Sequence, residues 1–255
     1  MDARRLAYLE AMGIDAYARR GAVTPPPPVV SSPAERSPVV AQSPGARSPV
    51  TAQRVAEQAP ATGAHPAGAL SWEALTAAVP GCTRCGLCEA RTQTVFGAGA
   101  GQARWMIIGE APTAEDDRLG EVFSGRAGEL LTSMLKACGL AREDVYLANV
   151  LKCRPPDNRD PTPAEVAECL PYLMNQITLV NPALILCVGR VAAQYLLGTA
   201  EPLSKLRGQV HTLGPGAWPL VVTYHPAYLL RSPSDKRAAW EDLQYAMAQV
   251  PPVVA

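Results

Sequence analysis

Four short apolar runs, separated by helical patterns, organise the C-terminal part of the chain. Turn residues bound these runs, which cover residues 105–109, 145–150, 183–189 and 220–224. Apolar positions recur at helical spacing over residues 127–138, 164–180, 190–197 and 234–250. Nearly continuous apolar strands that alternate with helices are typical of a parallel sheet covered on both faces. The pattern therefore predicts an α/β domain.

The first 70 residues have a different character. Residues 1–20 form a short amphipathic stretch, whereas residues 21–70 hold ten of the 25 prolines and no Phe, Trp or Tyr. Such a segment buries too little apolar surface to offset its ordering entropy, so we expect a disordered tether. The domain is then expected to occupy residues 71–255.

Charge and cysteine content narrow the class of protein. Lys plus Arg (23) equals Asp plus Glu (23), which excludes a protein held on nucleic acid by bulk positive charge and leaves only a local basic patch. The chain has no apolar run long enough for a membrane span and no signal-peptide pattern, so we expect a cytoplasmic protein. Seven cysteines in that compartment indicate metal binding or plain burial.

Polar and aromatic side chains follow the predicted strands where ligands of parallel sheets bind. Glu110 and Asp116 follow the first strand, Asn149 ends the second, and His225 follows the fourth, while Phe123 lies just beyond the acidic run. Together these residues suit a planar, hydrogen-bonding ring. Phe123 would stack on the ring, Asn149 would read a pyrimidine edge, and His225 would donate to a ring oxygen that gains charge. Glu110 or Asp116 could place a water molecule.

The segment after His225 suggests contact with DNA. Residues 228–231 (YLLR) could wedge into a base stack and then offer a cation to phosphate, as an enzyme that flips a base requires. The alternative for Leu229 and Leu230 is ordinary core packing at the start of a helix.

Five of the cysteines are candidate ligands. Cys82, Cys85 and Cys88 lie in GCTRCGLC, and Cys153 and Cys169 lie on either side of a Pro-rich loop. A C-x2-C pair joined to two distant cysteines suits either zinc or an iron–sulfur cluster, and the spacing does not separate the two. Cys138 and Cys187 fall in a helical pattern and an apolar run, so we expect both to be buried as small hydrophobes.

Residues 71–250 resemble the family 4 uracil-DNA glycosylases, the iron–sulfur members of the uracil-DNA glycosylase superfamily. The resemblance is carried by the motifs CTRC, VFGAG, GEAP, VFSGRAGELL, NVLKCRPPDNR and HPAYLLR. It implies a three-layer α/β/α sandwich around a central, mainly parallel four-stranded sheet. It also implies hydrolysis of the N-glycosidic bond of deoxyuridine in DNA, which releases uracil and leaves an abasic site.

The same resemblance assigns roles to individual residues. A structural [4Fe-4S] cluster would be held by Cys82, Cys85, Cys153 and Cys169, and Cys88 would not be a ligand. The implied catalytic and uracil-binding residues are Glu110, Ala111, Thr113, Asp116, Phe123, Asn149 and His225. The implied DNA contacts are Leu229 as the wedge, Arg231 and Arg154.

Two details bear on specificity. The family usually has glycine where this chain has Thr113. The resemblance implies that this position borders the C5 edge of the base, so the larger side chain could tighten thymine exclusion, lower activity or alter substrate choice. The loop of residues 154–161 (RPPDNRDP) has no histidine, so we set aside the related subgroup that bonds covalently to DNA.

Other interpretations remain open at this stage. The chain could be a non-catalytic or altered-specificity DNA-binding member of the superfamily, or a redox protein, although the latter leaves Phe123, Asn149 and HPAYLLR without a role. Residues 1–20 resemble the peptide by which the psi subunit docks onto the bacterial clamp loader, and could recruit the enzyme to replication. We expect a monomer.

Overall fold

The structure, a computed structural model, describes residues 70–250. The predicted amphipathic peptide 1–20 and nearly all of the predicted tether 21–70 lie outside the described residues, as do residues 251–255. No helix within the described range is both long and apolar enough to cross a membrane.

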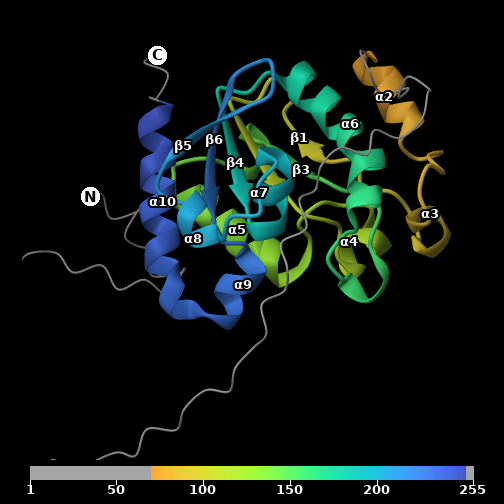
Figure 1. Ribbon diagram of the computed structural model, residues 1–255. Helices are drawn as coiled ribbons and strands as arrows, with labels where there is room; N and C mark the ends of the chain where they lie inside the picture. Colours follow the sequence, from red (N-terminus) through yellow and green to blue (C-terminus); the bar gives the residue numbers. More distant parts are fainter. Residues whose placement is uncertain (1–69, 251–255) are drawn as a thin grey trace, which may run out of the picture. The chain divides into compact units, whose positions relative to one another are not determined.

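A six-stranded sheet with the order β1-β3-β2-β4-β6-β5 forms the centre of the domain (Figure 1). The inner four strands are mutually parallel: β3 (Tyr146–Asn149), β2 (Trp105–Gly109), β4 (Leu184–Val188) and β6 (Trp218–Thr223). They correspond to the four apolar runs, so the predicted parallel sheet is confirmed. Two antiparallel edge strands, β1 (Ala98–Gly99) and β5 (Val210–Leu213), were not predicted, because they are short and largely exposed.

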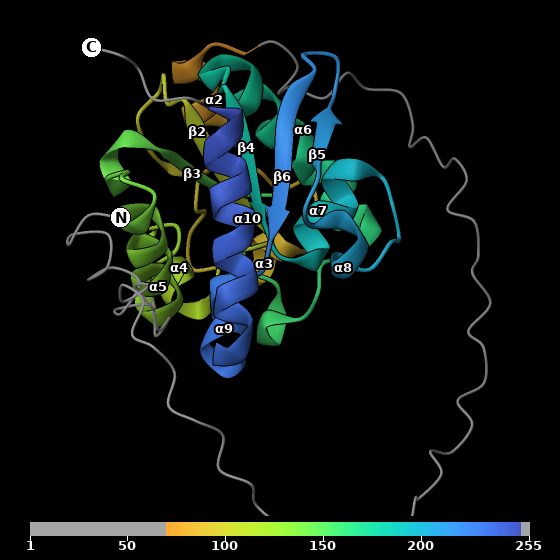
Figure 2. The ribbon, with the colours of Figure 1, turned by 90° about the vertical axis from the view of Figure 1, so that its left-hand side faces the viewer.

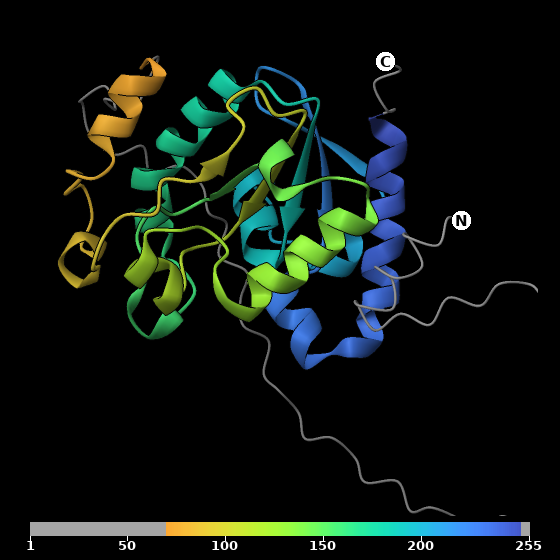
Figure 3. The same cartoon turned by 180° about the vertical axis from the view of Figure 1, so that it is seen from behind.

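Helices cover both faces of the sheet, as the alternation of strand side chains requires. In β2, Met106 and Ile108 belong to one buried cluster and Trp105 and Ile107 to the other. The first cluster includes side chains of α2 (Trp72–Ala78), α6 (Pro163–Val180), α7 (Arg190–Leu197) and α8 (Leu203–Leu206). The second includes side chains of α5 (Gly125–Ala137), α9 (Pro226–Arg231) and α10 (Lys236–Gln249). Figure 2 shows α10 on this side of the sheet, next to β4 and β6. Figure 3, which views the domain from behind, shows α5 in light green in the foreground. The α/β/α arrangement is confirmed.

Local sequence signals fix where the helices begin. Thr162 caps α6 by accepting a hydrogen bond from Glu165 N, and the Glu165 side chain accepts one from Thr162 N. The helix therefore begins at Pro163, one residue before the predicted range of 164–180. The short helices α3 (Leu87–Ala90) and α4 (Ala114–Leu119) were not predicted, because neither is long enough to show a helical period. The strands β4 and β6 point to the edge of the sheet where α9 lies (Figure 1).

Candidate active site and cysteine cavity

Two of the predicted site residues, Phe123 and Asn149, meet where β2 and β3 end. Gly109 and Asn149 are paired in register at the carboxyl ends of these strands. A Cβ atom added to Gly109 would lie 2.5 Å from Asn149 Oδ1 and 2.7 Å from Phe123 Cζ. Gly109 therefore lets the amide and the aromatic ring approach the same point on the backbone, and any larger residue there would displace them.

The backbone of Phe123 is held in an unusual conformation. Its φ of +52° lies in the left-handed region that non-glycine residues rarely occupy. Arg142 donates from Nη2 to the Phe123 carbonyl at 3.1 Å, and a Cβ at Gly128 would clash with that carbonyl. Asp116 fixes the next residue by accepting hydrogen bonds from both the main-chain N (2.7 Å) and the hydroxyl of Ser124. The ring orientation thus depends on contacts distributed over several elements.

Both carboxylate oxygens of Asp116 accept hydrogen bonds from other residues of the protein. Asp116 is 2 % exposed, and its second oxygen accepts a hydrogen bond from Thr113 N at 2.8 Å. Thr113 in turn caps α4, because its Oγ1 accepts a hydrogen bond from Asp116 N. Thr113 itself is exposed to solvent. The structure therefore places Asp116 behind the Phe123 loop and Thr113 at the start of a helix. Ala111, also a predicted site residue, is half-buried and packs against the first cluster.

His225 follows β6 and begins α9. Its ring lies 6.1 Å from that of Phe123, measured between centroids. Nδ1 accepts a hydrogen bond from Ala227 N at 3.1 Å, which assigns the proton of the neutral ring to Nε2. Burial, with a contribution from Arg231, lowers the pKa of His225 to about 4. At neutral pH the residue is therefore an uncharged imidazole that can donate through Nε2.

Glu110 lies directly after Gly109 and is half-buried. Burial and the neighbouring charge of Asp160 raise the pKa of Glu110 to about 7, and Arg190 opposes this effect. Arg190 also forms an ion pair with Asp160 at 2.8 Å. Glu110, one of the two residues predicted to place a water molecule, therefore changes its protonation state near neutral pH. A group that accepts a proton during the reaction requires such a pKa.

The predicted DNA contacts divide into buried and exposed residues. Leu229 is 1 % exposed and packs in the second cluster with side chains of α5 and α10, so the prediction that it inserts into DNA does not fit the structure. Tyr228 and Leu230, on the same short helix, are each 36 % exposed. Arg231 is exposed, and Arg154 is half-buried with its Nε donating to Asn158 Oδ1 at 2.8 Å. Helical spacing turns Leu229 inward and its neighbours outward.

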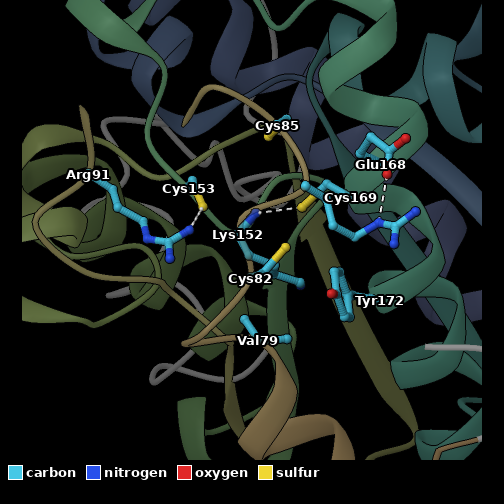
Figure 4. A pocket seen from close by; sticks show the side chains of 10 residues that line it. Val79, Cys82, Cys85, Arg91, Lys152, Cys153, Glu168, Cys169 and Tyr172 are labelled. Atoms are coloured by element: carbon cyan, nitrogen blue, oxygen red, sulfur yellow. Dashed lines mark hydrogen bonds and ion pairs between the residues drawn. The ribbon is translucent and has the colours of Figure 1, made fainter. Parts of the chain in front are cut away.

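Four cysteines line one cavity, here called the cysteine cavity (Figure 4). Its lining residues are Val79, Cys82, Arg84, Cys85, Arg91, Lys152, Cys153, Glu168, Cys169 and Tyr172. Cys88 is not among them. Within residues 70–250, no three His, Cys, Asp or Glu side chains lie close enough together to hold a single metal ion. The other two cysteines differ from each other: Cys187 is fully buried in β4, as predicted, whereas Cys138 is only half-buried, because it caps the end of α5.

The cavity presents hydrogen-bond donors and positive charge to the sulfur atoms. Arg91 donates from Nη1 to Cys153 Sγ at 3.0 Å, and the main-chain N of Lys152 donates to Cys169 Sγ at 3.2 Å. Burial raises the pKa of Cys169 to about 12, while the charge of Lys152 opposes this effect. Beside the four thiols the lining holds three cations and one carboxylate, Glu168, which pairs with Arg84 at 2.7 Å. This donor set, with net positive charge around it, suits a metal centre carrying net negative charge.

Lys152 and Gln176 form a buried polar group that the sequence analysis missed. Lys152 is 1 % exposed and Gln176 is fully buried, and Lys152 Nζ donates to Gln176 Oε1 at 2.6 Å. Gln176 Nε2 donates to the Tyr146 hydroxyl at 3.0 Å. The only sequence signal was the position of Lys152 between an apolar strand and a candidate ligand cysteine. On that signal alone, a lysine is expected to lie on the surface.

Comparison with known proteins identifies the class. The profile of the Uracil DNA glycosylase superfamily matches residues 96–244. This range holds the whole inner sheet and the residues grouped at its carboxyl edge. The chain therefore belongs to the uracil-DNA glycosylase superfamily.

Relatives within the superfamily narrow the assignment to its type-4 members, as the sequence motifs predicted. The type-4 uracil-DNA glycosylase of Thermotoga maritima is 42% identical over 178 residues, which cover 68% of this chain and 92% of that protein. The enzyme of the same name from Archaeoglobus fulgidus is 43% identical over 160 residues, covering 60% of this chain and 79% of the relative. A type-5 uracil-DNA glycosylase of Pyrobaculum aerophilum is more distant, at 30% identity over 145 residues, covering 50% of this chain and 62% of that protein.

Proposed function

We propose that this protein is a uracil-DNA glycosylase that flips deoxyuridine out of DNA and hydrolyses its N-glycosidic bond. The observation that carries the proposal is the grouping of Phe123, Asn149 and His225 at the carboxyl edge of the parallel sheet, in a chain that belongs with the type-4 enzymes. An aromatic face, an amide and a neutral imidazole donor are the groups needed to hold a flipped uracil. The reaction belongs to the repair of deaminated cytosine.

Each group has a role in binding the base. Phe123 stacks on the uracil ring, and its constrained backbone keeps the ring in place. Asn149 carries both a donor and an acceptor, which match the O4 and N3–H edge of uracil. Gly109 leaves the space beside both of these residues. Ala111 and Thr113 lie within four residues of Gly109, and we assign them to the wall of the pocket.

Bond cleavage places negative charge on the departing base. The C1′–N1 bond breaks, and its electron pair moves into the uracil ring and onto O2. His225 donates a hydrogen bond from Nε2 to that oxygen, and its low pKa keeps it a neutral donor that does not require a second proton. Uracil leaves as an anion and then takes a proton from solvent.

Water completes the hydrolysis at the sugar. Its oxygen bonds to C1′ of the cationic sugar, and its proton passes to the Glu110 carboxylate. The raised pKa of Glu110 matches this task near neutral pH. Both Asp116 oxygens already accept protein hydrogen bonds, so we assign Asp116 to holding the Phe123 loop.

DNA contact is assigned to the exposed face of α9 and the loop after β3. Leu230 replaces Leu229 as the side chain that fills the gap left by the flipped base, because Leu230 is exposed whereas Leu229 is buried. Arg231 and Arg154 provide cations for phosphate.

The cysteine cavity is assigned to a [4Fe-4S] cluster held by Cys82, Cys85, Cys153 and Cys169. When bound, the cluster would cross-link the segment before β2, the loop after β3 and helix α6, and thereby fix the DNA-facing loops. Arg91 and Lys152 offset the negative charge of the thiolates. Iron and sulfide analysis of anaerobically purified protein distinguishes this cluster from zinc.

We extend the proposal to the location of the protein and to its partners. The substrate is uracil-containing DNA in the cytoplasm, where reduced thiols are maintained. Residues 1–20 are proposed to recruit a replication protein of the clamp-loader type through the tether. A pull-down with this peptide tests the recruitment, and recovery of no replication protein would reject it.

Release of free uracil from a uracil-containing oligonucleotide, measured by chromatography, tests the activity itself. Binding to that oligonucleotide without release, by protein with its iron intact, would instead support a non-catalytic DNA-binding member of the superfamily.

A further inference from the structure

Lys152 carries a buried positive charge that no carboxylate balances. The side chain lies within the protein at 1 % exposure, and no Asp or Glu of residues 70–250 forms an ion pair with it. A buried ammonium without an opposite charge is strongly unfavourable. The residue lies instead against the cysteine cavity, whose lining includes Cys153 and Cys169.

The same lysine touches both the cysteine cavity and the candidate uracil pocket. Its main-chain N donates to Cys169 Sγ at 3.2 Å, and Figure 4 shows it among the cavity's cysteines. Its Nζ donates to the main-chain carbonyl of Asn149 at 2.9 Å. A single residue therefore connects the two sites, through its main chain at the cavity and through its side chain at Asn149.

The second acceptor of Lys152 is itself fixed. Gln176 Oε1 accepts from Lys152 Nζ at 2.6 Å, while Gln176 Nε2 donates to the carbonyl of Phe96 at 2.9 Å and to the Tyr146 hydroxyl at 3.0 Å. These bonds set the orientation of the Gln176 amide. The ammonium is thereby held against the carbonyl that ends β3.

We propose that Lys152 is a positioning residue for uracil recognition, coupling the filled cysteine cavity to the peptide plane that orients the Asn149 side chain. The thiolates of a bound cluster balance the ammonium, and the ammonium fixes the carbonyl of Asn149. The direction of the Asn149 Cα–Cβ bond follows from that peptide plane, and the amide group follows from the Cα–Cβ bond. This inference rests on the proposed function, because it concerns how Asn149 reads uracil.

A double-mutant cycle tests the coupling. Wild type, Asn149→Ala, Lys152→Met and the double variant are compared for binding to DNA carrying a non-hydrolysable 2′-fluorodeoxyuridine and to the same DNA carrying thymidine. Lys152→Met is expected to lower the preference for the uracil analogue at least tenfold, with unchanged binding to thymidine DNA. The second substitution should then add nothing in the Asn149→Ala background. Equal losses in both backgrounds, or equal losses on both DNAs, would overturn the proposal.

Arg91→Gln is the matched control, because Arg91 also donates to a cavity cysteine but its other hydrogen bond goes to the carbonyl of Pro80 and not to Asn149. At equal iron content it should leave the uracil preference unchanged, and a loss as large as that of Lys152→Met would contradict the proposal. If Lys152→Met retains no iron, wild type stripped of iron is compared with loaded wild type. An unchanged uracil preference after stripping would then reject the coupling. The binding readout also separates this inference from the proposed reaction, which fails only if wild type releases no uracil.

Discussion

The ring nitrogen Nδ1 of His225 accepts a hydrogen bond from the main-chain N–H of Ala227, at 3.1 Å. This bond both caps α9 and leaves Nε2 as the donor of the neutral ring. One contact therefore joins the folding of α9, the helix proposed to contact DNA, to the chemistry proposed at the pocket.

We expect His225→Asn to separate these two roles. Asparagine is a good N-cap, so α9 should begin normally and the thermal unfolding midpoint should stay near that of wild type. Loss of the donor to uracil O2 should lower kcat about a hundredfold to a thousandfold, the usual effect of removing one oxyanion donor. Single-turnover base release measures the effect. Wild-type rates from a well-folded His225→Asn would remove His225 from the mechanism.

The proposed role of Glu110 predicts a pH dependence. Its pKa is raised to about 7, so the carboxylate that accepts the proton of water becomes populated as pH rises through that value. We expect kcat/KM to increase from pH 6 to pH 8 and Glu110→Gln to be slow and to lack this increase. The low pKa of His225, about 4, places its own protonation below this range. An identical pH profile for Glu110→Gln would exclude Glu110 as the source.

The same pKa shift predicts an effect on stability. A carboxyl whose pKa is higher in the folded state than in the unfolded state binds more protons when folded, so it lowers stability as pH rises from the unfolded value towards about 7. Glu110→Gln removes this penalty. Its free energy of unfolding, relative to wild type, should therefore increase from pH 5 to pH 8 in urea titrations, whereas a difference independent of pH would contradict the burial of this charge.

Asp116→Asn tests the support of Phe123. The substitution keeps the shape but weakens the acceptor for Ser124 N and its hydroxyl, and we expect it to lower stability by about 1–3 kcal/mol. Uracil-DNA binding should weaken as in Phe123→Ala, with little further loss when the two are combined. A loss confined to the chemical step, with normal binding, would instead make Asp116 a catalytic group.

Leu229 and Leu230 provide a matched pair on one helix. Leu229→Ala should lower stability by about 2–5 kcal/mol, because it opens a cavity in the second cluster. Leu230→Ala should change stability by less than about 0.5 kcal/mol, since the side chain is exposed.

The functional effects should show the opposite order. Leu230→Ala is expected to slow base release from duplex DNA more than from single strands, because only the duplex has a gap to fill. If Leu229→Ala gives the duplex-specific defect at full folding while Leu230→Ala does not, the assignment of the wedge is wrong.

The inner sheet could be predicted from the sequence, because residues 105–109 and 183–189 are short, continuous apolar runs that alternate with helical patterns. This pattern is typical of parallel strands covered on both faces. Sequence reasoning also placed Phe123, Asn149 and His225 at one edge, since the carboxyl ends of parallel strands share that edge. The resemblance assigned the wedge to Leu229. The burial of this side chain could not be predicted from the sequence, because the direction of a side chain on a six-residue helix depends on how the helix packs against α5 and α10. Lys152 was missed because its burial depends on α6, which follows it in the chain.

The most direct test of the account is single-turnover release of uracil from oligonucleotides that carry one uracil. Wild type, Asn149→Ala and His225→Asn are purified anaerobically and compared at matched iron content. The account predicts release by wild type, a large loss in both folded variants, and no release of thymine from a matched oligonucleotide. Release by both variants at the wild-type rate would show that the catalytic pocket lies elsewhere.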